Sequence, residues 1–224
     1  LKRLFEEWQI GMQEHNGWNS LFWCNHDQPR IVSRMGNEGT YWKQSAKMLA
    51  AAVHLMRGTP YIYQGEEIGM PNAHFKDITD YRDVESLNYY EILLKEGKTK
   101  EEAIKTLQER SRDNSRTPMQ WSDEKNAGFS DVIPWISLPD HYKETPPENE
   151  LKDEDSIYYF YKKLIELRKE KEVIQEGTIE FFVKEDDDLL AYERNYKEEH
   201  LVVFNNLTEK EKEVEIPQLW TSYH

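Results

Sequence analysis

Residues 21–30 read LFWCNHDQPR, an apolar run that turns abruptly polar. The run from Leu21 to Cys24 predicts a buried strand, which we place at residues 19–25. Pro29 cannot donate a ladder hydrogen bond, so the strand should end before it. An Asn-His-Asp cluster therefore lies at the carboxyl end of the predicted strand. From the residues alone, the favoured interpretation is a turn in which an Asx side chain caps the next segment.

The same cluster also fits a chemical interpretation. A carboxylate at Asp27, flanked by His26, can stabilise a developing positive charge or accept hydrogen bonds from a polyol. Pro29 and Arg30 would fix the turn and add a cation nearby. Composition alone does not separate a catalytic carboxylate from a capping residue.

The segment after this strand predicts a parallel arrangement. Residues 41–57 have the apolar spacing of a helix, which ends at Gly58 with Pro60 just beyond. Residues 61–63 form a second short strand, followed at once by a polar Gln-Gly-Glu-Glu segment. A strand, a helix and a strand joined by short connections indicate a parallel βαβ unit. Both strands end in polar residues, on the face where α/β barrels place their chemistry.

Glu66 and Glu67 follow the second strand directly. Paired carboxylates can serve acid–base catalysis, but neighbours on a strand point to opposite faces. Both therefore cannot serve one site, and we expect at least one of them to bind loop amides.

The remaining chain divides into a helical and a β-rich part. Residues 1–14 and 154–171 have the spacing of amphipathic helices, and a long excursion at about 71–150 holds two more, near 82–96 and 99–112. From residue 174 the period changes to short alternating runs, GTIEFFV, LLAYERNY, EHLVVFNNL and KEVEIP, typical of antiparallel strands. We therefore predict two domains, 1–172 and 173–224, the second with too few strands for a complete sandwich.

Composition excludes several partners. The 224 residues carry a net charge of −14, which argues against nucleic acid and against anionic membranes. No apolar run is long enough to span a bilayer, and we expect no signal peptide. The single cysteine suits a reducing compartment, so we expect a cytoplasmic protein. Residue 1 falls inside a helix and is not Met, which suggests a piece of a longer chain.

No metal or cofactor is expected. The histidines His15, His26, His54 and His74 lack the paired spacing of metal ligands. No phosphate-cradling glycine loop and no Ser-His-Asp order stands out. Residues 110–121, RSRDNSRTPMQW, place three arginines beside Asp113. Guanidinium groups suit carboxylates, phosphates and sugar hydroxyls, although a solvated charge run is favoured on composition alone.

Three motifs together carry a family resemblance. NHDQPR, then GTPYIYQGEEIGM, then RDNSRTPMQW, in this order, resemble the C-terminal part of α-glucosidases of the α-amylase superfamily, glycoside hydrolase family 13. The resemblance implies the C-terminal part of a (β/α)8 TIM barrel with an insertion after its eighth strand, then part of an all-β sandwich. Residues 19–25 would be strand seven, residues 60–63 strand eight and residues 154–171 the last barrel helix.

The resemblance also implies site residues. Asp27 matches the carboxylate that stabilises the transition state, and His26 matches a histidine that hydrogen-bonds the cleaved glucose. Arg116 matches an arginine of the same subsite, and Arg112 one nearer the leaving group. The nucleophile and the acid/base would lie upstream, outside this chain. Retaining hydrolysis needs both, so the chain alone is expected to be inactive.

Among the subfamilies, FWCNHDQPRIVSR, ITDYRDVESLN and SRDNSRTPMQW together most resemble the trehalose-6-phosphate hydrolases. The implied reaction is hydrolysis of trehalose 6-phosphate to glucose and glucose 6-phosphate, a small-molecule sugar substrate. One alternative is an oligo-1,6-glucosidase that acts on isomaltose-type sugars. Another is a non-catalytic, amylase-like binding protein. The sequence leaves the oligomeric state and the phosphate-binding residues open.

Overall fold

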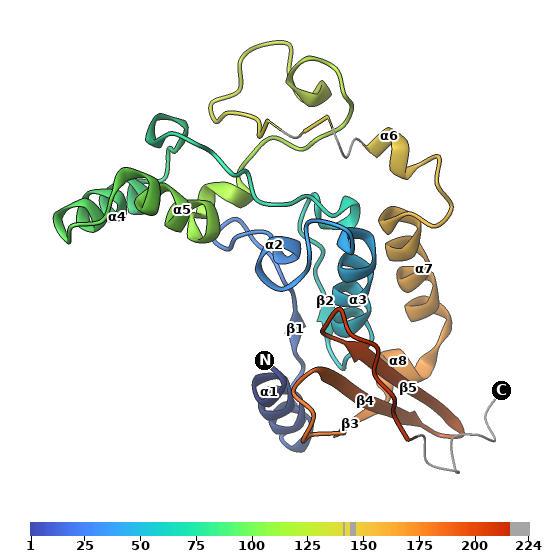
Figure 1. Ribbon diagram of the computed structural model, residues 1–224. Helices are drawn as coiled ribbons and strands as arrows, with labels where there is room; N and C mark the ends of the chain where they lie inside the picture. The colour runs from blue at the N-terminus through green and yellow to red at the C-terminus, as the bar shows by residue number, and fades with distance from the viewer. Residues whose placement is uncertain (141, 144–146, 216–224) are drawn as a thin grey trace.

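The computed structural model describes residues 1–140, 142–143 and 147–215. Figure 1 shows a group of helices around a short parallel pair of strands, with an antiparallel sheet below it. The helices are α1 (Lys2–Glu14), α2 (Ile31–Met35), α3 (Trp42–His54), α4 (Val84–Lys95), α5 (Lys100–Arg110), α6 (Pro147–Glu150), α7 (Ile157–Glu170) and α8 (Glu172–Glu176). The strands are β1 (Ser20–Leu21), β2 (Thr59–Pro60), β3 (Thr178–Phe182), β4 (Leu189–Tyr196) and β5 (Glu199–Asn206).

The predicted βαβ unit is present, but its strands are shorter than expected. β1 pairs in parallel with β2, Ser20 opposite Thr59, and α3 connects them. The strands expected at 19–25 and 60–63 shrink to two residues each. The pair is held by Thr59 N, which donates to the Asn19 carbonyl at 2.8 Å, and by Tyr61 N, which donates to the Leu21 carbonyl at 2.7 Å. The buried side chains beyond β1, Trp23 at 8% and Cys24 at 3% exposure, continue the apolar run without ladder bonds.

The main core lies between α3, α7 and the antiparallel sheet. The Ala-rich face of α3 allows close approach, and Tyr192 Oη on β4 donates to the Ala52 carbonyl at 3.0 Å. Arg168 on α7 donates to the carbonyl of His54 at 3.1 Å, which satisfies the end of α3. The large buried side chains of this core include Leu49, Val53, Met56, Ile157, Tyr161, Leu164, Ile174, Leu190 and Tyr192.

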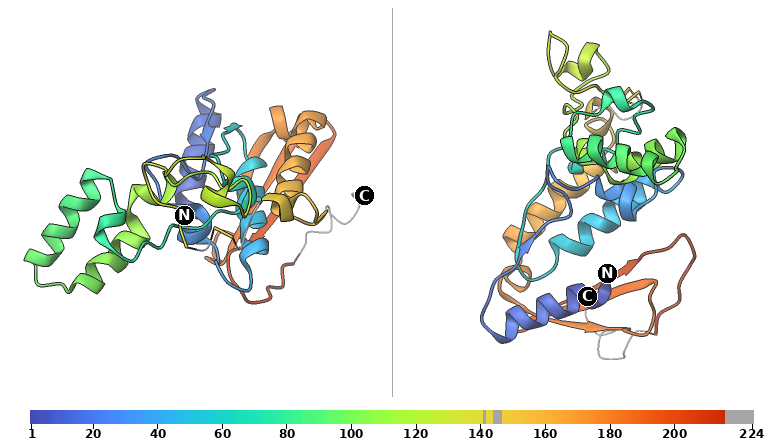
Figure 2. Two further views of the ribbon diagram at one scale, coloured as in Figure 1. Left: turned by 90° about the horizontal axis from the view of Figure 1, so that it is seen from above. Right: turned by 90° about the vertical axis from the view of Figure 1, so that its left-hand side faces the viewer.

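The antiparallel sheet has the order β3-β4-β5. Figure 2 shows α1 alongside it, and Ile179 N donates to Gln13 Oε1 of α1 at 2.7 Å. Arg194 of β4 is fully buried and donates to the carbonyls of Leu55 at 2.7 Å and Gly177 at 2.7 Å. The sheet therefore shares its core with the helices that precede it.

A fourth strand expected at 212–217 is not formed where the structure describes it. Residues 212–215 form neither helix nor strand, and 216–217 lie outside the described residues. The Thr-Pro-Pro segment at 145–147, which predicts a turn, lies largely outside them too. The division into domains 1–172 and 173–224 stays a prediction.

The excursion between β2 and α7 forms its own small unit. α4 and α5 pack as a helical hairpin that projects to the left in Figure 1. Its core is made of Phe75, Tyr81, Tyr90, Leu93, Ala103, Leu107 and Ile136. α5 starts with a capping box in which Thr99 and Glu102 satisfy each other's backbone N–H groups. α4 starts at Asp83, whose carboxylate accepts from Ser86 N at 3.2 Å.

Candidate active site

The polar cluster after β1 folds into a tight turn that leaves one carboxylate exposed. The side chain of Asn25 accepts a hydrogen bond from Asp27 N at 2.8 Å. The capping turn predicted for this cluster is thus made by Asn25, which frees the Asp27 carboxylate for other contacts. The side chain of Asp27 is 45% exposed, and His26 Nε2 lies 3.2 Å from Asp27 Oδ2.

Two arginines from a distant segment meet this carboxylate. Arg116 Nη2 lies 2.7 Å from Asp27 Oδ1, and Arg116 Nε donates to the His26 carbonyl at 2.8 Å. Arg112 Nη1 lies 3.6 Å from the same Asp27 oxygen. The 3-10 helix Arg112–Ser115, capped by Ser111, carries one of these arginines and ends at the other. The structure therefore brings together all four predicted site residues, across about 90 positions of sequence.

A second carboxylate, which the sequence reasoning missed, lies behind the arginines. Arg112 binds Asp83 with two bonds, Nη2 to Oδ1 at 2.6 Å and Nε to Oδ2 at 3.2 Å. Arg116 Nη1 lies 3.4 Å from Asp83 Oδ1. Burial raises the pKa of Asp83, but the hydrogen bonds from Arg112 and Ser86 outweigh it and hold the pKa below its usual value. Two sequence signals point to Asp83: it lies in the motif ITDYRDVESLN, and it stands three residues before Ser at a helix start.

Asp113 supports this arrangement from inside. Its side chain is fully buried, and Oδ2 accepts from the backbone N–H groups of Arg82 at 2.7 Å and Asp83 at 2.8 Å. Because both donors are main-chain groups, Asp113 fixes the entry to α4. Its role is structural.

Arg30 anchors the loops beneath the site. Its guanidinium is 1% exposed and donates to the carbonyls of Gln64 and, at 3.3 Å, Asn114. Its backbone N–H donates to Asn72 Oδ1 at 2.9 Å. The cation predicted near Asp27 thus points inward and joins the three sequence motifs, while Ser115 Oγ donates to the Gln28 carbonyl.

The adjacent acids Glu66 and Glu67 both bind loop groups. Glu66 accepts from Tyr63 N at 3.3 Å and from Tyr161 Oη at 3.2 Å, and Glu67 accepts from Gly65 N at 2.8 Å. The prediction that at least one binds loop amides is confirmed. Its geometric premise is wrong, since both lie in the 3-10 helix Glu66–Ile68 and not on a strand.

The burial of Glu66 predicts a pH-dependent stability. Desolvation raises the pKa of Glu66 from 4.5 to about 7. As the pH rises, the Glu66 carboxyl ionises in the unfolded chain at a lower pH than in the folded protein. The stabilisation that is present below pH 4.5 is therefore lost as the pH rises towards 7. In the wild type we expect the unfolding free energy to fall by up to about 3 kcal/mol between about pH 4.5 and pH 7. In Glu66→Gln this fall should be absent.

Urea denaturation at several pH values measures this effect. The matched control is Glu67→Gln, one residue further on and half-buried, which leaves the buried carboxyl in place. An unchanged pH slope in Glu66→Gln would contradict the assignment.

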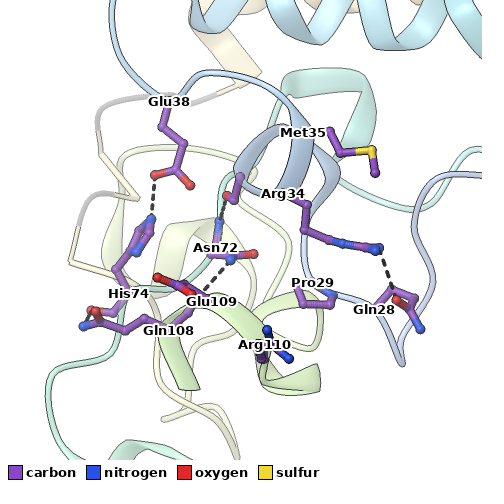
Figure 3. Close-up of a pocket in the computed structure, with 11 residues that line it drawn as sticks. Gln28, Pro29, Arg34, Met35, Glu38, Asn72, His74, Gln108, Glu109 and Arg110 are labelled. Carbon is purple, nitrogen blue, oxygen red and sulfur yellow. Dashed lines mark hydrogen bonds and ion pairs between the residues drawn. The ribbon is translucent and has the colours of Figure 1, made fainter. Parts of the chain in front are cut away.

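Two hollows flank the turn that carries Asp27. One, of about 540 Å³, is lined by Asp27, Asp83 and Arg112. The other, of about 670 Å³, lies beyond Gln28, and Figure 3 shows Arg34 reaching across to Gln28 while Glu38 pairs with His74. Only the first contains the carboxylate and one of its arginines, so it is the candidate active site. Arg112 in this hollow and Arg116 beside it hold the exposed Asp27 carboxylate in a fixed place, which suits a polyol ligand that develops positive charge.

Two properties of the described residues concern metals and membranes. Within residues 1–140, 142–143 and 147–215, no three His, Cys, Asp or Glu side chains lie together as metal ligands do. Across the same residues, no helix has the length and apolar character needed to cross a bilayer.

Known proteins with similar sequences identify the family of this chain. The family described as alpha amylase, catalytic domain, matches residues 1–177. Trehalose-6-phosphate hydrolase of Bacillus subtilis (strain 168) is 49% identical over 217 residues, which is 97% of this chain and 39% of that protein. Oligo-1,6-glucosidase of Bacillus cereus is 48% identical over 219 residues, with the same two shares, 97% and 39%.

Solved structures agree with the sequence matches. The crystal structure of Bacillus licheniformis trehalose-6-phosphate hydrolase superimposes with a TM-score of 0.94 at 56% identity, over 97% of this chain and 39% of that one. The chain thus spans about two-fifths of the length of the relatives it matches. The predicted fold class, part of a (β/α)8 barrel followed by an antiparallel β region, is confirmed. The chain belongs to the alpha-amylase catalytic-domain family of glycoside hydrolases.

Proposed function

We propose that this chain forms part of a cytoplasmic retaining α-glucosidase that hydrolyses trehalose 6-phosphate to glucose and glucose 6-phosphate. The observation that carries the proposal is the exposed Asp27 carboxylate, which is held by Arg112 and Arg116 and lines a hollow together with Arg112. The likeness to trehalose-6-phosphate hydrolases over 97% of the chain supports the substrate.

In the proposed reaction each residue has a separate task. A nucleophile from outside this chain attacks the anomeric carbon while an acid, also from outside, protonates the glycosidic oxygen. The negative charge of Asp27 stabilises the oxocarbenium-like sugar as positive charge develops. His26 hydrogen-bonds a hydroxyl of the same sugar. Arg116 fixes Asp27, and Arg112 lies on the side of the leaving group.

The experiment compares two substrates on a full-length enzyme that carries this chain. We expect kcat/KM for trehalose 6-phosphate to exceed that for isomaltose by about 100-fold or more, since a site built for a charged group rejects substrates that lack it. The reverse order would favour an oligo-1,6-glucosidase, which the 48% identity to the Bacillus cereus enzyme supports as second candidate. Binding of either sugar without turnover would indicate a non-catalytic protein.

A further inference from the structure

We propose that Asp83 is a positioning residue that holds Arg112 and Arg116 in register against Asp27. The proposal rests on the proposed function, because it assigns Asp83 a part in the same reaction. Asp83 belongs to the insertion, so the proposal gives that segment a task at the site. Four lines of structural observation carry it.

The two arginines each bridge the two carboxylates. Arg112 spans from Asp83 Oδ1, at 2.6 Å from Nη2, to Asp27 Oδ1, at 3.6 Å from Nη1. Arg116 spans the same oxygens with Nη1 at 3.4 Å and Nη2 at 2.7 Å. A planar guanidinium has its donors in a fixed fork, so a bond on one side sets the direction of the other. The position of Asp83 therefore determines where the donors meet Asp27.

Burial separates the tasks of the two carboxylates. The side chain of Asp83 is 4% exposed and that of Asp27 is 45% exposed. A buried charge interacts more strongly with its partners than an exposed one, because less solvent screens it. The inner carboxylate thus dominates the orientation of the arginines, and the outer one stays accessible to a sugar.

Asp83 is itself held firmly. Its backbone N–H donates to Asp113 Oδ2 at 2.8 Å, and its Oδ2 accepts from Ser86 Oγ at 3.0 Å. It is also the N-cap of α4, so its carboxylate is tied to the start of a helix. A side chain with this many fixed partners can serve as a reference point for the more exposed groups.

The charge balance explains why a carboxylate is needed there. Two guanidinium groups face the carboxylates of Asp27 and Asp83, while Glu85, at 71% exposure, lies 3.2 Å from Arg112 Nη2 and the buried Asp113 lies 3.9 Å from Arg116 Nη1. Without the negative charge of Asp83, Arg116 would have Asp27, at 2.7 Å, as its nearest carboxylate, and Arg112 would be shared between Glu85 at 3.2 Å and Asp27 at 3.6 Å. Both arginines would then be free to move towards Asp27 and occupy the oxygen atoms that the sugar needs.

The test is Asp83→Asn in the full-length enzyme. Asn keeps the size and the helix-capping ability of Asp but loses its charge. We expect kcat for trehalose 6-phosphate to fall by about 100-fold, as for a catalytic group displaced by about 1 Å, with KM within about threefold of its original value. Asp83→Glu, which restores the charge, should recover part of the loss. Asp77→Asn, another capping Asp of the insertion, is the matched control.

Two further measurements separate positioning from folding. In an Asp27→Asn background, Asp83→Asn should cost little more, because residues that act through one another are not additive. Crystals of the Asp83→Asn enzyme should show Arg112 Nη1 closer to Asp27 Oδ1 than the present 3.6 Å. An unchanged distance, a full additive loss of kcat or an unchanged kcat would each overturn the proposal. A wild-type enzyme without turnover would overturn the proposed function instead, while the crystal comparison would still test Asp83.

Discussion

Asp27→Asn in the full-length enzyme is expected to lower kcat for trehalose 6-phosphate by about 1,000-fold while KM changes little. The substitution keeps the size and the turn but removes the negative charge. Asp27 is exposed enough to meet a sugar, and its Oδ1 is already oriented by Arg116 at 2.7 Å. A charge that acts on the developing cation stabilises the transition state more than the ground state, so kcat carries the loss.

Steady-state kinetics with the purified variant measures this effect. Asp123→Asn is the matched control, because Asp123 is exposed and lies in the insertion away from the Asp27 hollow. A variant that retains more than about a tenth of the wild-type kcat would contradict the proposed role, given the size of effect that one such group supplies.

Arg30→Lys is expected to lower the unfolding free energy by about 3 kcal/mol. The Arg30 guanidinium is buried and donates to two main-chain carbonyls on different loops. Lys keeps the buried charge, and with it the cost of desolvation, but its single ammonium cannot reach both carbonyls. The substitution therefore loses hydrogen bonds and recovers none of the burial cost.

The urea midpoint of the variant, compared with wild type at fixed slope, gives this difference. Arg34→Lys, four residues on and exposed, makes the same chemical change at the surface and should alter stability by less than about 0.5 kcal/mol. Equal stabilities of the two variants would show that the buried guanidinium does not hold the loops.

Local patterns predicted the helices well and the strands poorly. Helices expected at 1–14, 82–96 and 154–171 appear as α1, α4 and α7, because a helix satisfies its own backbone. The strands next to the site came out short because a ladder depends on a partner that a local pattern does not contain. The fourth β run failed in its described part for the same reason.

The site could be predicted only where a motif identified it. From the residues alone, the favoured interpretation is a capping turn for the Asp27 cluster and a solvated charge run for residues 110–121. What makes them a site is an ion pair between Arg116 and Asp27, 89 positions apart, which no local pattern encodes. Asp83 escaped detection because its main contact, Arg112, lies 29 residues further along. Only Ser86, three residues away, was visible as a local capping partner.

The side chain of Arg194 crosses the predicted domain boundary at 172/173. Its donors reach Leu55 before the boundary and Ile174 and Gly177 after it, all within 3.1 Å. One guanidinium therefore ties the helical segment and the β-rich segment together through their main-chain carbonyls. If the sheet were cut away, α3 would lose the Arg194 donor at the carbonyl of Leu55 and the buried side chains of β3, β4 and β5 that belong to its core. We therefore expect sheet and helices to unfold in one cooperative step. A substitution in the sheet that changes the shared core would require matching substitutions in the helices that face it.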